Sequence, residues 1–217
     1  MPVAFDAASV VTGGAVSSLS WSHTCTGTDR LLVVGVSWGD EDPGASIISG
    51  VTYAAVDLTT VGSRFRAVTN FSFRTHQWRL IAPTTGANTI VVTFDSATEE
   101  IVGGGVSMTG VDQTTPLGTQ AGADGNTSPA TVDAVSATDE LVLDTLYVDS
   151  QTITIGAGQT QRWQDRFPAA GGIYSRGAGS TESGAATVTM SWTLGGNEGW
   201  VLMGVSAKAA AAAATVP

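Results

Sequence analysis

The stretch Trp21–Trp38, WSHTCTGTDRLLVVGVSW, gathers four side chains that could perform chemistry. They are His23, Cys25 (the only cysteine of the chain), Asp29 and Arg30. A thiolate nucleophile needs a base and an orienting group within reach. Whether this segment is part of an active site therefore depends on the elements that position these side chains.

The alternation of residue types predicts that His23 and Cys25 belong to a half-buried strand. In such a strand Cys25 acts as a small hydrophobic residue, and His23 can approach it only as a strand neighbour. TGTDR then predicts a turn in which Asp29 caps backbone donors, and LLVVGVSW predicts a strand buried on both faces. We therefore interpret the segment as two strands and a turn. One face of the first strand, expected to be buried, consists of Leu19, Trp21, His23 and Cys25. The other face consists of Ser18, Ser20, Ser22 and Thr24.

A weak metal candidate lies in the acidic turn GDEDPG, where Asp40, Glu41 and Asp42 supply three carboxylates beside turn residues. Carboxylate oxygens suit Ca²⁺, but the fuller ligand spacing of a calcium loop is missing. A solvated acidic turn is the favoured interpretation, and we assign no metal.

Other carboxylates do not form a catalytic pattern. Glu99 and Glu100 are adjacent and would face opposite ways on a strand, which is not the geometry of a glycosidase pair. Asp144 and Asp149 are isolated, and the two histidines, at 23 and 76, lie far apart in the sequence. Neither a phosphate-binding glycine loop nor a nucleophile elbow is found. We predict no catalytic residues, no cofactor and no enzymatic activity.

Arginine and tryptophan residues offer two binding hypotheses. The arginines near one long strand are expected to pair with carboxylates, either within the domain or across a subunit boundary. Some of the tryptophans could stack on sugars if they are exposed, whereas buried ones would belong to a core. The residues concerned are Arg64, Arg66, Arg74 and Arg79, and Trp78, Trp163 and Trp200.

Short β-type runs separated by turn residues recur along the whole chain, and no helical period persists before the tail. This pattern predicts an all-β fold, an antiparallel β-sandwich of jelly-roll type, in a single domain over residues 1–207. The expected strands lie near residues 3–7, 18–25, 31–38, 47–53, 56–62, 70–81, 89–95, 101–109, 130–135, 141–148, 159–164, 172–177, 186–192 and 200–207.

Weak internal echoes are present. SSLSW at 17–21 resembles VTMSW at 188–192, and Gly-Val-Ser occurs at 35–37, 105–107 and 204–206. The two outer strand pairs could be equivalent hairpins of a pseudo-symmetric sandwich. A shared β-type composition explains the echoes equally well.

The alanine-rich segment 208–217 breaks the β-pattern. It is too short for a stable isolated helix and has no large side chain to bury. We expect it to be an arm that docks on a neighbouring subunit, because ordering it has an entropic cost that contacts must offset. The arm residues are Ala209, Ala210, Ala211, Ala212, Ala213, Ala214, Thr215, Val216 and Pro217.

The charge balance excludes two classes of partner. The net charge is −10 and the only lysine is Lys208, so we expect neither nucleic acid nor an anionic membrane as a partner. The N-terminus lacks the features of a secretory signal, yet the Ser, Thr, Gly and Val content is typical of extracellular β-proteins and virion parts. We expect a protein made in the host cytoplasm that works in a virion, or alternatively outside the cell or on its surface.

Several segments together resemble a known module. DRLLVVGVSWG, VTYAAVDLTTVGS, WRLIAPTTGANTIVVTF and GGVSMTGVDQTTPLGT, with the closing ATVTMSW and GWVLMGVSAK, resemble a β-sandwich module of uncharacterised bacterial surface proteins and tailed-phage structural proteins. The resemblance covers nearly the whole chain and carries no catalytic motif. The chain departs from it at Ala54–Ala55, where the module would have glycines in a hairpin turn.

These observations favour a non-enzymatic structural protein of a tailed-phage virion. We expect a capsid decoration or cement protein, a homotrimer that contacts other virion proteins such as the major capsid protein. The alternative is an extracellular carbohydrate-binding or adhesion module, of tail-fibre or cell-surface type, that binds a glycan. A sandwich-fold glycan hydrolase is less favoured than either. An exposed row of tryptophans would favour sugar binding, and burial of all six would favour the structural role.

Overall fold

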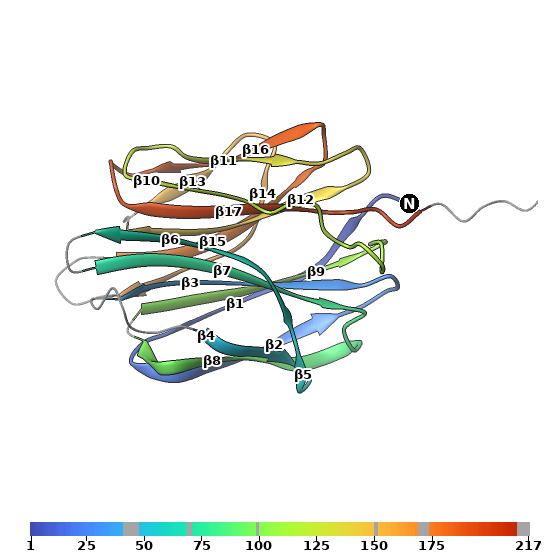
Figure 1. Cartoon of the computed structure of the whole chain (residues 1–217), viewed down its shortest axis with the longest axis horizontal. Helices are drawn as coiled ribbons and strands as arrows, with labels where there is room; N and C mark the ends of the chain where they lie inside the picture. Colours follow the sequence, from blue (N-terminus) through green and yellow to red (C-terminus); the bar gives the residue numbers. More distant parts are fainter. Residues whose placement is uncertain (41–47, 69–70, 99, 150–151, 169–173, 212–217) are drawn as a thin grey trace, which may run out of the picture.

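The chain folds into stacked antiparallel β-sheets. The computed structural model describes residues 1–40, 48–68, 71–98, 100–149, 152–168 and 174–211, and these contain no helix. The described strands form four sheets, which lie one above another as layers (Figure 1). The all-β antiparallel class is therefore confirmed, as two sandwiches packed face to face. The strand order does not establish a jelly roll.

The first half of the chain forms the two lower layers of Figure 1. Its inner sheet has the order β1-β9-β3-β7-β6, and its outer sheet has the order β2-β8-β4-β5. The strands are β1 (Ala4–Gly13), β2 (Val16–Cys25), β3 (Leu31–Asp40), β4 (Ile48–Tyr53), β5 (Val56–Asp57), β6 (Thr59–Val68), β7 (Phe71–Ile81), β8 (Gly86–Thr98) and β9 (Glu100–Thr109).

The second half forms the two upper layers. Its inner sheet has the order β10-β17-β12-β15-β14, and its outer sheet has the order β11-β16-β13. The strands are β10 (Ala121–Gly125), β11 (Ala130–Val135), β12 (Leu141–Asp149), β13 (Ile153–Ile155), β14 (Thr160–Pro168), β15 (Tyr174–Ser183), β16 (Thr187–Leu194) and β17 (Trp200–Ala207). The sequence reasoning missed β10, which consists of small residues, and β13, which has only three residues.

The two halves repeat the same topology. Replacing β1, β9, β3, β7 and β6 by β10, β17, β12, β15 and β14 converts one inner sheet into the other, and β2, β8 and β4 correspond to β11, β16 and β13. Across the central interface β1 packs against β14, and the corresponding strands β10 and β6 also pack together. This reciprocity is the mark of a two-fold arrangement. The chain is thus a pseudo-dimer of two like sandwiches.

The sequence echoes only partly follow this pseudo-symmetry. Gly-Val-Ser at 105–107 and at 204–206 occupy equivalent places, since they pair with Leu32–Val34 of β3 and with Val142–Asp144 of β12. SSLSW and VTMSW lie in β2 and β16, which are not equivalent strands. The pseudo-symmetric sandwich exists, but the hairpins matched from the sequence were the wrong ones.

Hydrophobic side chains fill the spaces between the layers. From β3, Leu32 and Val34 point into the core of the first sandwich, while Leu31 and Val33 point into the central core between the halves. In the same way β12 sends Val142 into the core of the second sandwich and Leu143 into the central one. The predicted strand buried on both faces is therefore confirmed for β3, and its structural counterpart β12 shares that environment.

The two halves are in close contact where β3 meets β12. A Cβ atom on Gly35 would lie only 2.3 Å from Oγ1 of Thr145, so no larger residue fits without movement. Gly35 pairs with Gly104, and Thr145 pairs with Met203. Each partner directly precedes the glycine of a Gly-Val-Ser segment, so Gly35 and Thr145 occupy equivalent positions. The pseudo-two-fold axis therefore passes between them.

The start of the tail belongs to the body of the fold. The Ala210 amide donates to the Gly110 carbonyl at 2.8 Å, and Ala209 forms an isolated bridge with Val111. Lys208 likewise donates its amide to the carbonyl of Pro116 at 2.8 Å. Residues 212–217 of the expected arm lie outside the described residues.

The Ala54–Ala55 turn keeps a geometry that normally requires glycine. It connects the paired residues Tyr53 and Val56, and the two alanines have φ values of 51° and 61°. Positive φ at both central positions is the type I′ pattern that matches the twist of a hairpin. The two alanines therefore hold a hairpin turn in a strained left-handed conformation.

We predict that Ala55→Gly raises the free energy of unfolding by about 1 kcal/mol, because it removes the left-handed strain of an alanine. Ala87→Gly in strand β8 is the matched control and should lower stability by roughly 0.5–1 kcal/mol. Urea unfolding measures both. Destabilisation by Ala55→Gly would show that the turn is not strained.

We also predict that Val34→Asp abolishes soluble expression, because Val34 has no exposed surface and an unpaired buried charge costs several kcal/mol. Val135→Asp, at a valine that is 68% exposed, should express normally. A soluble Val34→Asp variant with the wild-type melting temperature would contradict the described core.

Candidate functional site

Strands β1, β2 and β9 bring a group of polar side chains together inside the first sandwich. The alternation of β2 turns His23 and Cys25 inward, as the sequence predicted. Beside them lie Ser9 of β1, Ser107 of β9 and Tyr53 at the end of β4. This is the place where the structure could have formed a thiol site.

The hydrogen bonds of His23 do not lead to the thiol. Trp21 Nε1 donates to Ser9 Oγ at 2.9 Å, and Ser9 Oγ lies 2.8 Å from His23 Nδ1. Either Ser9 Oγ or His23 Nδ1 can be the donor, depending on which ring nitrogen of His23 is protonated. Nε2 is buried without a hydrogen-bond partner among the described residues. Burial lowers the pKa of His23 to about 4, against the opposing charge of Asp6, so the ring is neutral at neutral pH.

Cys25 is held as a neutral thiol. It has no exposed surface, and burial raises its pKa, against hydrogen bonds from Tyr53 and Ser107. Because the thiolate is the nucleophilic form, this environment suppresses the reactivity of the sulfur. Cys25 behaves as the small core residue that the sequence predicted.

The remaining charged residues of the segment stabilise the turn. Arg30 donates from Nε to the Pro83 carbonyl at 2.8 Å and from Nη1 to the Gly27 carbonyl at 2.6 Å. Asp29 has a φ of 48°, within the turn. The four side chains do not converge on one point, so the interpretation as two strands and a turn is confirmed.

Asp6 was not singled out in the sequence, yet it links β1 to the turn that follows β2 by hydrogen bonds to Thr26. Its Oδ2 accepts hydrogen bonds from the Thr26 amide at 2.8 Å and from Ser107 Oγ at 2.7 Å, and its Oδ1 accepts one from Thr26 Oγ1. Although partial burial opposes the effect, these bonds hold the pKa of Asp6 below its ordinary value. The carboxylate serves the fold at this point.

Of the other carboxylates considered in the sequence, the structure describes only some. Glu41, Asp42 and Glu99 lie outside the described residues, as does the side chain of Asp40. Glu100 accepts a hydrogen bond from Ser175, whose Oγ lies 2.6 Å from the Tyr147 hydroxyl. No group of three or more metal-ligating side chains occurs within the part of the chain that the structure describes.

The sequence reasoning missed a buried carboxylate centre in the second sandwich. Asp144 is fully enclosed, and its carboxylate accepts hydrogen bonds from Trp192 Nε1 at 2.7 Å, from the Ser180 amide at 2.6 Å and from Ser180 Oγ at 3.0 Å. Gln159 Nε2 lies 3.5 Å from the same carboxylate and 2.6 Å from Ser180 Oγ. These partners are far apart in the sequence, so spacing gave no signal for them.

Burial and hydrogen bonding act on Asp144 in opposite directions. Burial raises its pKa to about 7, and the donors from Trp192 and Ser180 only partly offset this rise. A carboxyl group with such a pKa could in principle exchange a proton near neutral pH. Here it is enclosed by donors that belong to its own domain, and this arrangement is that of a structural polar centre.

The equivalent place in the first sandwich is apolar. Val34 corresponds to Asp144, since both pair with the glycine of a Gly-Val-Ser segment. Trp78 and Leu58 stand where the second half has Ser180 and Gln159, as the matching bulges of β6 and β14 show. The polar centre therefore distinguishes the two halves and does not belong to the repeated fold.

All six tryptophans are buried, so they provide no exposed platform for a sugar ring. Trp200 additionally donates from Nε1 to the Thr127 carbonyl at 2.8 Å. Their exposed fractions are 9% for Trp21, 0% for Trp38, 5% for Trp78, 4% for Trp163, 0% for Trp192 and 6% for Trp200.

Of the four arginines expected to pair with carboxylates, Arg64 and Arg66 are seen to do so, within the domain. Arg66 Nη1 lies 3.1 Å from Asp124 Oδ2, and Arg64 contacts the other oxygen of the same carboxylate. Because Asp124 belongs to β10, these pairs connect the two halves. The Arg74 guanidinium stacks on the Phe65 ring at 4.3 Å from its centroid.

Two shallow depressions flank Thr60 at the β6 edge of the first inner sheet. One, of about 260 Å³, includes Ser49, Asp57 and Trp78, and the other, of about 230 Å³, includes Arg79 and Gln120. They lie on either side of an edge strand, and neither contains a pair of groups suited to acid–base chemistry.

Comparisons with protein-family models, with curated proteins and with solved structures gave no match. Among the described residues, no helix has the length and apolar character needed to span a membrane.

We predict that Asp144 makes stability depend on pH. Its folded pKa of about 7 exceeds the ordinary value of 3.8, so its contribution is complete below about pH 4 and is lost as the pH rises through 7. The advantage of the wild type over Asp144→Asn in free energy of unfolding should therefore shrink by a few kcal/mol between these limits. Chemical denaturation of both proteins across this pH range measures it. An advantage that grows with pH would show that the donors outweigh burial.

Proposed function

We propose that this protein is a non-enzymatic structural protein of a tailed-phage virion, of the capsid decoration or cement type, that works through subunit contacts. The observation that carries the proposal is the burial of all six tryptophans. It supports a structural role because the large aromatic side chains serve the cores and are not available as a ligand platform.

The reactive side chains support the same role. Cys25 is buried with a raised pKa, and the hydrogen bond of His23 goes to Ser9. The carboxylate of Asp144 is enclosed by donors from its own sandwich. Each of these groups is engaged in holding strands together.

The outer faces of the molecule suit a protein that lies on the solvent-exposed surface of a particle. The outward side chains of β2 and β16 are short hydroxyl residues, which stay hydrated and do not form an apolar patch. They are Ser18, Ser20, Ser22 and Thr24 on β2, and Thr187, Thr189, Ser191 and Thr193 on β16. Contacts with other subunits would then use the sheet edges, the ends of the body or the tail.

A carbohydrate-binding or adhesion module remains the second candidate, and the depression beside Trp78 is the feature that favours it. Trp78 is only 5% exposed, so it offers no open ring face for stacking. The decisive experiment adds the purified chain to virions from which it has been removed. Saturable binding at fixed sites, seen by cryo-electron microscopy, supports the decoration role. Absence of binding to particles, together with retention on a glycan array, would support the second candidate instead.

We predict different effects for two truncations of the tail. Deleting 212–217 should leave the melting temperature unchanged and weaken attachment to the particle, because these small side chains add little to the core of the domain. Deleting Ala209–Pro217 also removes the hydrogen bond from Ala210 to Gly110, which should cost about 1 kcal/mol of stability. Calorimetry and a particle-binding assay separate the two effects. Full binding by the shorter truncation would contradict the arm hypothesis.

A further inference from the structure

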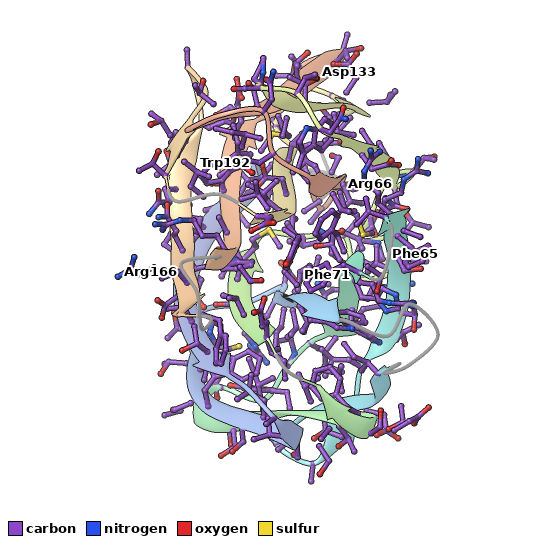
Figure 2. All side chains as sticks on the ribbon, turned by 90° about the vertical axis from the view of Figure 1, so that its left-hand side faces the viewer. Phe65, Arg66, Phe71, Asp133, Arg166 and Trp192 are labelled. Carbon is purple, nitrogen blue, oxygen red and sulfur yellow. The ribbon has the colours of Figure 1, made fainter. Side chains whose placement is uncertain are left out.

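We propose that the edge strands β1 and β2 form a face through which two copies of this chain pair. Among the described strands, β1 ends the inner sheet of the first half and pairs only with β9, while β2 ends the outer sheet and pairs only with β8. An edge strand presents a row of backbone N–H and C=O groups that can accept another strand. The blue N-terminal strands lie on one side of the molecule, and the side with Phe65 on β6 is opposite (Figure 2).

This edge lacks the charges that normally prevent edge pairing. No charged residue occurs between Asp6 and Asp29, a segment that covers nearly all of β1 and the whole of β2. Charged side chains and bulges are the usual protection of an edge strand. The register shifts lie near the start of each strand, between Phe5 and Ala7 in β1 and between Val16 and Ser18 in β2, so the segments beyond them can pair regularly.

The other described edge strands are protected. β10 has only five residues, and β5 and β13 have two and three, so they offer little to pair with. The longer edges β6 and β14 are distinguished by charged side chains, and β11 has a carboxylate. The charged residues are Arg64 and Arg66 on β6, Arg162, Asp165 and Arg166 on β14, and Asp133 on β11.

The lack of charge on this edge allows a second copy of the chain to occupy it. Two chains of net charge −10 repel each other, so they can meet at low cost only where neither presents carboxylates. On the neighbouring β14, Arg162 is turned onto the Phe5 ring, 3.7 Å from its centroid, and so does not obstruct the β1 edge. The first sandwich therefore offers an uncharged side along both of its layers.

The sequence of β1 also suits antiparallel pairing with itself. A two-fold axis at Val10 places Val10 opposite its own copy, Ser9 opposite Val11, and Ala8 opposite Thr12. These are small or β-branched residues, which pack well as cross-strand pairs. Val10 is 39% exposed in the single chain, and such a partner would cover it. The paired inner sheets would become one continuous sheet across the two copies.

This interface would provide one of the subunit contacts of the function proposed above, and it rests on that proposal for its role. Pairing of two copies in solution does not require a virion, so the dimer and the virion role can be tested separately. Pairing about a two-fold axis closes at two copies. It therefore replaces the homotrimer expected from the sequence with a dimer as the unit that forms in solution.

The test is the mass of the full chain by sedimentation equilibrium. We expect about twice the chain mass of 22.0 kDa for the wild type. Val10→Glu places like charges opposite each other and should weaken the dimer by about tenfold or more. Val135→Glu is the matched control at another exposed valine and should leave the dimer unchanged.

A second variant keeps the proposal testable if Val10→Glu fails to fold. Val10→Cys should form a disulfide-linked dimer under mild oxidation, because the two β-carbons lie close together at the axis. Val135→Cys should not form one, and the buried Cys25 should not compete. A monomeric or trimeric wild type, or a Val10→Cys protein that is not cross-linked, would overturn the proposal.

Discussion

The structure depends on covering both faces of the two central strands, β3 and β12. Each sends side chains into its own sandwich and into the shared central core, so neither half can present its inner sheet to water. At their crossing, Gly35 lies against Thr145 with no room for a side chain. The close approach makes the central core dense and ties the stability of each half to the other. The pairs of Arg64 and Arg66 with Asp124 reinforce the same interface at its edge.

Within this frame the two halves have diverged in their cores. The first sandwich has Val34 and Trp78 where the second has Asp144 and Ser180, with Trp192 donating to the carboxylate. A buried carboxylate without its donors would be costly, so the whole polar set must be kept or lost together. The two halves therefore differ in the residues of their cores although their strand orders agree. The Gly-Val-Ser segments of β9 and β17 stay alike at equivalent positions.

Strand alternation and turn residues were sufficient to predict the all-β class and most strands from the sequence. They also placed His23 and Cys25 on a buried face and Leu32, Val34 and Val36 in a core, because period-two burial is a local property. The sequence echoes suggested a pseudo-symmetric sandwich but matched the wrong hairpins, since the true equivalence depends on pairing between distant strands. Asp144 looked isolated for the same reason: its donors come from other strands of the second sandwich. The subunit contacts stay predictions, because they depend on partners outside the chain.

The central claim is that the two sandwiches form one cooperative unit through the contact of β3 with β12. Native-state hydrogen exchange on Gly35→Ala tests it most directly, because the added methyl group disturbs only the crossing with Thr145. The account predicts that amides of β12 lose protection together with those of β3, and by a similar factor. Loss of protection confined to the first half, with β12 unchanged, would contradict it.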